Sequence, residues 1–411
     1  FTDAVTMNPS ISLEKGTVYP FVEMAAVDPG ARSVGESECR EFDGGGARFA
    51  PGDTLMARIT PCLENGKIAR FRPTDETSIG FGSTEFIVIR GRPGVTTDDF
   101  AYYLTKWPEF RQFAIGQMTG SSGRQRVPAD SLAGFLATIP PIPAQRRIAD
   151  VLGKLDDKID LNRRMNRTLE KMAAAIFKSW FIDFDPVHAK AQGHDPGLPA
   201  EIADLFPDSF ENSALGPIPK RWTPGKLGDV VEILDSKRIP LSSAERAQRK
   251  GPYPYYGAAG VLDHVDDFLF SGTHVLMGED GSVVTDYDKP VVQYVWNLFW
   301  VNNHAHVLRG KNGFTEEHLY LFLKQLNIRP YVTGAVQPKL NQRNMKSVPM
   351  VVPPKAVSEA FGRVVGPLFQ KFRANADEGR TLAGLRDTLL PKLLSGEIEL
   401  PEAEAVAEGV K

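Results

Sequence analysis

Apolar residues recur in alternating steps of four and three along two stretches of the chain, near residues 148–180 and 361–393. A spacing that averages 3.5 residues, kept over about four heptads, is typical of a coiled-coil seam. It predicts two long helices, which we expect to pack against each other rather than only on a neighbouring domain. The seam positions are Ile148, Leu152, Leu155, Ile159, Asn162, Asn166, Leu169, Ala173, Ile176 and Trp180, then Phe361, Val365, Leu368, Phe372, Asn375, Gly379, Leu382, Arg386, Leu389 and Leu393.

The region before each predicted helix repeats. Shorter apolar runs such as 85–89 and 290–296, separated by glycine-rich turns, predict strands in both copies. Five segments recur in the same order, which indicates two copies of one unit of about 200 residues. The matching segments are 1–5 with 227–231, 16–21 with 251–255, 85–91 with 304–310, 97–99 with 315–317, and 126–127 with 339–340. Each copy then reaches a proline pair, at 140–141 and 353–354.

These patterns predict an α+β fold with two repeated mixed α/β domains, separated by a pair of long antiparallel helices. The second domain lies between the helices in the chain, and an antiparallel pair would relate the two copies by a pseudo-two-fold axis. We expect a first domain at 1–140, a helix at 141–185, a linker at 186–217, a second domain at 218–352, a second helix at 353–398 and a tail at 399–411.

Two asparagines interrupt the apolar seam at equivalent places. Asn162 lies near the middle of the first predicted helix, and its repeat mate is Asn375. In an antiparallel pair only central residues face their own equivalents, so we expect these two side chains to lie close together at the pseudo-dyad. A polar residue in a seam costs stability but fixes register and orientation.

Composition limits the class of protein. The 411 residues carry 48 Lys and Arg against 51 Asp and Glu, a net charge of −3. A nucleic-acid surface would therefore have to come from local basic stretches, such as 58–72, 111–128 and 337–346. The chain shows no membrane-length apolar run and no signal-peptide pattern, so we expect a cytoplasmic protein. It begins with Phe1 rather than Met, and we expect its natural start to lie upstream.

Catalytic signatures are missing from the sequence. It contains no P-loop motif, and the glycine run 44–46 lacks the context of a dinucleotide site. His304 and His306 alternate on a predicted strand, but without further ligands at metal-binding spacing we interpret them as packing or surface residues. Cys39 and Cys62 have no histidine base nearby in the sequence. The sequence predicts no catalytic residue and no metal site.

Several long motifs resemble a known family. Residues 139–149 (IPPIPAQRRIA), 155–162 (LDDKIDLN) and 175–184 (AIFKSWFIDF) resemble the central conserved region of type I restriction-modification specificity subunits. Residues 389–398 (LLPKLLSGEI) are similar to that family's distal conserved region. IPKRW at 218–222 resembles the usual start of a target-recognition domain, and the first copy lacks this lead-in.

The resemblance implies a division of labour. Each domain would read one half of a split site in double-stranded DNA, and the helices would set the spacing. The seam from Ile148 to Trp180 would span roughly 48 Å, or on the order of 14 base pairs of B-DNA. Two modification subunits would transfer methyl groups from S-adenosylmethionine to adenine N6, and restriction subunits would add ATP- and Mg-dependent cleavage. The chain itself would hold no cofactor and catalyse nothing.

Four aromatic residues at the end of the first predicted helix are candidates for docking the modification subunits. They are Phe177, Trp180, Phe181 and Phe184. The alternative is that these rings are buried under the adjacent domain of the same chain.

Two polar loops in each domain are the candidate DNA readers. Arginine pairs with guanine, Asn and Gln pair with adenine, and Ser suits phosphates. In the first copy the candidates are Arg58, Thr60, Asn65, Lys67, Ser121, Ser122, Arg124, Gln125 and Arg126. In the second copy they are Glu279, Ser282, Gln337, Lys339, Asn341, Gln342 and Arg343.

Two other classes of function remain open from sequence. A stand-alone DNA-modifying enzyme would be active without partners. A bivalent scaffold for ligands other than DNA would show no salt-dependent DNA affinity.

Overall fold

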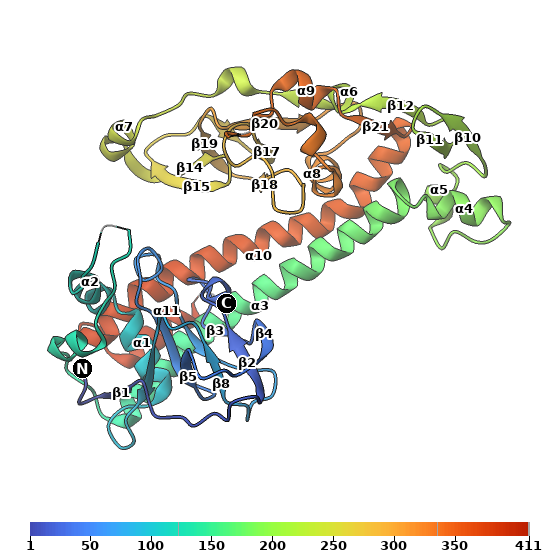
Figure 1. The fold of residues 1–411 in the computed structure, drawn as a ribbon. Coiled ribbons are helices and arrows are strands. Elements are labelled where there is room, and N and C mark those ends of the chain that lie inside the picture. The colour runs from blue at the N-terminus through green and yellow to red at the C-terminus, as the bar shows by residue number, and fades with distance from the viewer. Residues whose placement is uncertain (122, 335, 410–411) are drawn as a thin grey trace. The chain divides into compact units, whose positions relative to one another are not determined.

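In the computed structural model, which describes residues 1–121, 123–334 and 336–409, the chain falls into two units. The first unit comprises Phe1–Arg164 with Asn375–Lys411, and the second comprises Met165–Ala374. Two long helices, α3 (Ile142–Phe181) and α10 (Lys355–Ser395), each contribute one half to either unit (Figure 1). Mixed sheets combined with these helices confirm the predicted α+β class.

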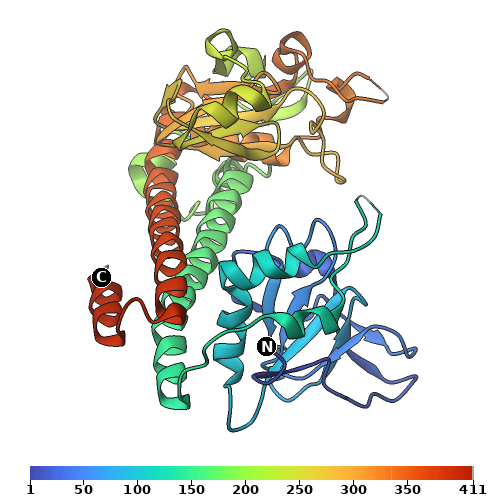
Figure 2. The same cartoon turned by 90° about the vertical axis from the view of Figure 1, so that its left-hand side faces the viewer.

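The first unit contains two sheets. The five-stranded sheet has the order β1-β9-β6-β7-β3, and the four-stranded sheet has the order β4-β2-β8-β5. The strands are β1 (Val5–Met7), β2 (Val18–Val22), β3 (Ser33–Val34), β4 (Glu38–Glu41), β5 (Ala47–Phe49), β6 (Thr54–Ala57), β7 (Ile68–Phe71), β8 (Gly80–Gly82) and β9 (Phe86–Gly91). The helices besides the long pair are α1 (Asp98–Lys106), α2 (Pro108–Gly116) and α11 (Leu400–Glu408). Helix α11 lies beside the long helices, where Glu404 accepts from Arg147 of α3 at 2.9 Å (Figure 2).

The second unit contains two four-stranded sheets, β13-β20-β17-β18 and β15-β14-β19-β16, and two strand pairs, β10-β11 and β12-β21. The strands are β10 (Phe210–Ser213), β11 (Gly216–Pro219), β12 (Thr223–Lys226), β13 (Val231–Ile233), β14 (Lys250–Gly257), β15 (Gly260–Val265), β16 (Phe270–Ser271), β17 (His274–Gly278), β18 (Val292–Val295), β19 (Leu298–Val301), β20 (Ala305–Gly310) and β21 (Pro349–Val352). The shorter helices are α4 (Asp185–Ala191), α5 (Ala200–Ala203), α6 (Leu227–Val230), α7 (Ser243–Gln248), α8 (Glu316–Gln325) and α9 (Gln342–Lys346).

Strand register confirms the repeat inferred from sequence. In the first unit β1 pairs antiparallel with β9 so that Val5 faces Gly91. In the second unit β13 pairs antiparallel with β20 so that Val231 faces Gly310. The helix that follows is capped in the same way in both units, because Thr97 accepts from Phe100 N and Thr315 accepts from His318 N. The capping threonine and the acidic first turn explain why both helices start where they do.

The long helices run antiparallel within each unit. In the first unit Arg386 of α10 donates to Asp156 of α3 at 2.7 Å. Further along α3, Asn162 donates to Glu378, which comes earlier in α10, at 2.8 Å. In the second unit Asn166 donates to the Phe372 carbonyl oxygen at 2.9 Å, and further along α3 the Phe177 ring contacts that of Phe361, which comes earlier in α10.

The aromatic end of α3 belongs to the core of the second unit. Phe177 and Trp180 are each only 2% exposed, and Phe181 and Phe184 are partly buried against the same cluster. Their rings contact those of other buried aromatic residues, including Phe206, Trp222 and Phe361. The expectation that these four residues form an exposed docking patch is therefore wrong. The second domain covers them, because their combined apolar surface is too large to leave in water.

Among the described residues, no helix is long and apolar enough to span a membrane.

We predict that Asn162 and Asn375 face each other closely enough to be crosslinked. Both are 1% exposed in the first unit, and the Asn162 contact with Glu378 places Asn375 one turn away on α10. With Cys39 and Cys62 replaced by serine, an Asn162→Cys, Asn375→Cys double variant should form a crosslink under mild oxidation, read as a mobility shift on non-reducing gels. The matched control is Leu161→Cys with Thr381→Cys, two exposed positions on the same helices. Crosslinking of the control pair but not of the central pair would contradict this register.

A buried histidine in the second unit predicts acid sensitivity. His318 is 2% exposed among aromatic rings, its Nδ1 has no hydrogen-bond partner in the described structure, and burial lowers its pKa to about 3. The unfolded chain binds a proton near pH 6.5 whereas the folded chain does not, so this group's contribution to stability is lost as the pH falls. Between pH 7 and pH 5 we expect it to lower the free energy of unfolding by about 2 kcal/mol. Urea unfolding should show this loss in the wild type and not in His318→Phe, after the pH effect common to both is subtracted.

Candidate nucleic-acid interface

Two loops lie side by side at the end of the central strands of the first unit. The first-unit strand-end loop (58–67) follows β6, and the first-unit hairpin loop (119–127) follows α2. Val127 N donates to the Arg58 carbonyl at 2.8 Å, and Thr60 N donates to the Gln125 carbonyl at 3.0 Å. The hairpin is closed by two bonds between Thr119 and Arg126, at 3.0 and 2.9 Å. Backbone bonds therefore place both predicted loops on one surface, whatever their side chains are.

The second unit repeats this arrangement with different residues. Its strand-end loop (279–291) follows β17, and its hairpin loop (333–340) precedes α9. Leu340 N donates to the Glu279 carbonyl at 2.9 Å, and Gly281 N donates to the Pro338 carbonyl at 3.1 Å. Thr333 and Lys339 close the hairpin with two bonds, at 2.8 and 2.7 Å. The loops that sequence predicted as equivalent are thus equivalent in hydrogen bonding.

Some of the predicted readers present available side chains. Exposed side chains without a hydrogen bond or ion pair to other described residues are those of Asn65, Ser121 and Arg124 in the first unit and Ser282 and Arg343 in the second. Gln337 and Lys339 are also exposed, and each contacts Asp280, at 2.8 and 3.4 Å. Ser122 lies outside the described residues. These groups provide donors for base edges and phosphates.

Other first-unit candidates are used inside the protein. Arg126 forms a bidentate pair with Glu85, with contacts of 2.6 to 2.9 Å, and this pair raises the Arg126 pKa. Lys67 donates to the Met24 carbonyl at 2.8 Å, and the half-buried Thr60 hydroxyl contacts the Met118 sulfur at 3.6 Å. Gln125 is half-buried and offers its carbonyl to Thr60 N. The side chains of Arg126, Lys67 and Thr60 are thus engaged within the protein, whereas the Gln125 contact involves only its backbone.

Second-unit candidates divide in the same way. Asn341 caps α9 by accepting from Asn344 N at 2.8 Å, and Gln342 donates to Asp235 at 2.7 Å. Glu279 accepts from Arg238 at 2.5 Å. Sequence could not separate Gln342 and Glu279 from the available residues, because their partners lie 107 and 41 positions away in the chain.

A hollow beside the first-unit loops was not predicted from sequence. It has a volume of about 460 Å³ and is lined by Arg58 and Arg48, with Asn8, Ser10 and Thr84 among its polar residues. Arg58 is half-buried there. The segment containing Asn8 gave no sequence signal, since it reaches the loops only through the pairing of β1 with β9.

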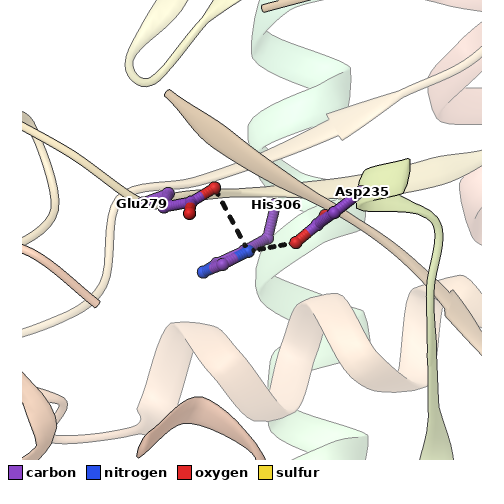
Figure 3. Close-up of side chains that lie close together, drawn as sticks. All are labelled: Asp235, Glu279 and His306. Carbon is purple, nitrogen blue, oxygen red and sulfur yellow. Dashed lines mark hydrogen bonds and ion pairs between the residues drawn. The ribbon is translucent and has the colours of Figure 1, made fainter. Parts of the chain in front are cut away.

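The second unit has a buried polar cluster beneath its loops, which sequence also missed. His306 on β20 lies between Asp235 and Glu279 (Figure 3). Its Nδ1 is 2.6 Å from Asp235 Oδ2 and 3.5 Å from Glu279 Oε2. Burial raises the Asp235 pKa, but the hydrogen bond and charge of His306, the Val307 amide and Arg238 lower it more, so it lies below its usual value.

The potential metal-ligating atoms of this cluster lie within 4.8 Å of one another. Nevertheless, the geometry favours a hydrogen-bonded network over a metal site. Arg238 contacts both carboxylates, at 2.5 Å for Glu279 and 3.6 Å for Asp235, and so supplies positive charge where a metal ion would. Both imidazole nitrogens of His306 already have partners in the protein.

Comparisons with known proteins agree with this architecture. The model for the type I restriction modification DNA specificity domain matches residues 12–171 and 219–369. The HindI specificity subunit of Haemophilus influenzae is 26% identical over 370 residues, covering 77% of this chain and 81% of that protein. The MjaIX specificity subunit of Methanocaldococcus jannaschii is 24% identical over 400 residues, covering 92% and 85%.

A solved S subunit of a type I restriction-modification system from M. genitalium has a similar fold. It aligns with a TM-score of 0.50 and 16% identity over 95% of this chain and 94% of that one. The family match covers most of both repeats, including the first part of the long helix that follows each. The chain therefore belongs to the family of type I restriction-modification DNA specificity subunits, of which it carries two domain copies.

Proposed function

We propose that each unit reads one half of a bipartite site in double-stranded DNA, using its strand-end loop and its hairpin loop. The main support for this proposal is that the two units share the backbone of these loops but differ in the side chains that the loops expose. The same backbone hydrogen bonds place the loops in both units, whereas the exposed side chains differ. Different side chains on one scaffold suit two half-sites of different sequence.

The available side chains indicate how each half-site is read. In the first unit Arg124 suits a guanine edge, Asn65 suits an adenine edge and Ser121 suits a phosphate. In the second unit Arg343 and Lys339 provide the positive charge, and Gln337 and Ser282 provide uncharged donors and acceptors. Phosphate contacts by the cations would make binding weaken as salt increases.

The catalysis belongs to partners in this proposal. The chain is the non-catalytic recognition component, and it assembles with two modification subunits that supply S-adenosylmethionine-dependent methylation. Restriction subunits that use ATP and Mg would complete a nuclease. The long helices α3 and α10 would set the spacing between half-sites.

Co-expression with a type I modification subunit that forms a complex with this chain, followed by genome-wide mapping of methylated adenine, tests the proposal. We expect methylation at one motif with two specified halves around an unspecified gap. Methylation by this chain alone would favour a stand-alone enzyme. A folded complex with no salt-dependent DNA affinity would favour a scaffold for other ligands.

Replacing Arg124 should relax one half-site only. Arg124→Ala removes an exposed guanidinium from the first-unit hairpin loop, and losing a bidentate base contact costs about 1–3 kcal/mol of discrimination. Binding of the purified complex to DNA with single-base changes should show weaker discrimination at the first unit's half-site and unchanged discrimination at the other.

The matched control is Arg146→Ala, which removes the same charge from an exposed position on α3 outside the loops. Equal weakening on every sequence by Arg124→Ala would mean that Arg124 contacts phosphate rather than a base. Identical behaviour of the two variants would remove the hairpin loop from the reading surface.

A further inference from the structure

One buried position differs in chemistry between the two units. Strand pairing places Met56 opposite Ile87 in the first unit and Met277 opposite His306 in the second, so Ile87 and His306 are structural equivalents. Both side chains are fully buried. The first unit therefore has an aliphatic residue under its loops, whereas the second has an imidazole.

Hydrogen bonding determines the protonation state of His306. Its Nε2 is 2.7 Å from the Leu340 carbonyl oxygen, which can only accept, so Nε2 carries a hydrogen. Its Nδ1 is 2.6 Å from Asp235 Oδ2. The same carboxylate accepts from Val307 N at 2.9 Å and from Gln342 Nε2 at 2.7 Å. An ionised carboxylate with these donors cannot donate to Nδ1, so Nδ1 also carries a hydrogen and the ring is an imidazolium.

Charges within this cluster balance. The imidazolium and Arg238 supply two positive charges, and Asp235 and Glu279 supply two negative ones. Buried charges are costly unless they are paired and hydrogen-bonded, and each of these four groups has such a partner, Arg238 with Glu279 and His306 with Asp235. Such a network adds little net stability, but it is satisfied in one geometry and therefore selects a single arrangement of the segments that contribute to it.

Those segments are the supports of both second-unit loops. Glu279 begins the strand-end loop, and Leu340 ends the hairpin loop while donating its own N–H to the Glu279 carbonyl. Gln342 lies in α9, directly before Arg343. A shift at His306 would therefore move the exposed cations Lys339 and Arg343.

We propose that His306, held as an imidazolium between Asp235 and the Leu340 carbonyl, is a positioning residue that sets the specificity of the second unit's half-site. It acts through the loops and does not touch DNA. The first unit has the aliphatic Ile87 at this position, and its loops are held by backbone bonds and by side-chain pairs such as Arg126 with Glu85. This inference rests on the proposed reading of one half-site by each unit.

The test uses the complex of this chain with its modification subunit and compares methylation at matched and singly mismatched sites. His306→Ile installs the first unit's residue and removes both ring hydrogen bonds. We expect discrimination at the second unit's half-site to fall at least about tenfold, with discrimination at the first half-site unchanged. Gln342→Ala, a milder change at a half-buried position, should reduce the same discrimination less and keeps the test valid if His306→Ile fails to fold.

A control separates positioning from general destabilisation. Leu319→Ala removes a fully buried side chain of α8 in the same unit without touching the cluster. We expect it to lower stability while leaving half-site discrimination intact. If Leu319→Ala lowers discrimination at the second unit's half-site as much as His306→Ile does, the effect of His306→Ile reflects lost stability alone. That result would overturn the proposal.

A spectroscopic readout addresses the imidazolium directly. In the complex labelled with ¹⁵N-histidine, the His306 signals are those lost in His306→Ile, and near neutral pH both ring nitrogens should show attached hydrogens. A singly protonated ring would overturn the imidazolium assignment. Equimolar bound zinc, with discrimination lost on chelation, would replace it with a metal site.

Failure of this inference is distinguishable from failure of the proposed function. If the wild-type complex methylates no bipartite motif, the reading of half-sites is wrong. If it methylates such a motif and folded His306→Ile retains full discrimination in both halves, only the role of His306 is wrong.

Discussion

A buried carboxylate joins three helices in the first unit, and the position of the recognition loops depends on it. Asp156 of α3 is 3% exposed and accepts from Arg386 of α10 at 2.7 Å and from Tyr103 of α1 at 2.8 Å. Removing either donor would leave a buried charge poorly compensated, which is strongly destabilising. These contacts therefore constrain the register of α3 against α10 and also hold α1 of the recognition domain against α3. The sheet that carries the loops is positioned by the same contacts.

In the second unit, other residues connect the recognition domain to the long helices. Glu317 of α8 accepts from Tyr294 at 2.6 Å and from Arg373 of α10 at 3.1 Å. Tyr320 of α8 donates to Glu170 of α3 at 2.7 Å. In both units a tyrosine hydroxyl, a carboxylate and an arginine connect a recognition domain to the long helices. Both units therefore use the same three kinds of group to attach the recognition domain to the long helices. The groups come from different positions in the two repeats.

In this fold, the contacts that position the recognition loops are different from the side chains that can contact DNA. Backbone bonds at 58–60 and 279–281 place the loops, and internal pairs such as Arg126 with Glu85 stiffen them. Few side chains then remain free to contact DNA, which lets a change in one of them alter a half-site without disturbing the support. The second unit adds a charged network around His306 beneath this surface, and the first unit has an open hollow beside Arg58.

The sequence alone determined the repeat, including its matching segments at 97–99 and 315–317, the long helices and the equivalence of the loops. These features follow from periodicity and local hydrogen bonding, which depend on residues close together in the chain. Only the tertiary structure decided that Phe177 and Trp180 are buried and that Gln342 and His306 are tied to Asp235. Those contacts join residues 71 and 107 positions apart, and no local pattern encodes which distant partner a polar side chain will meet.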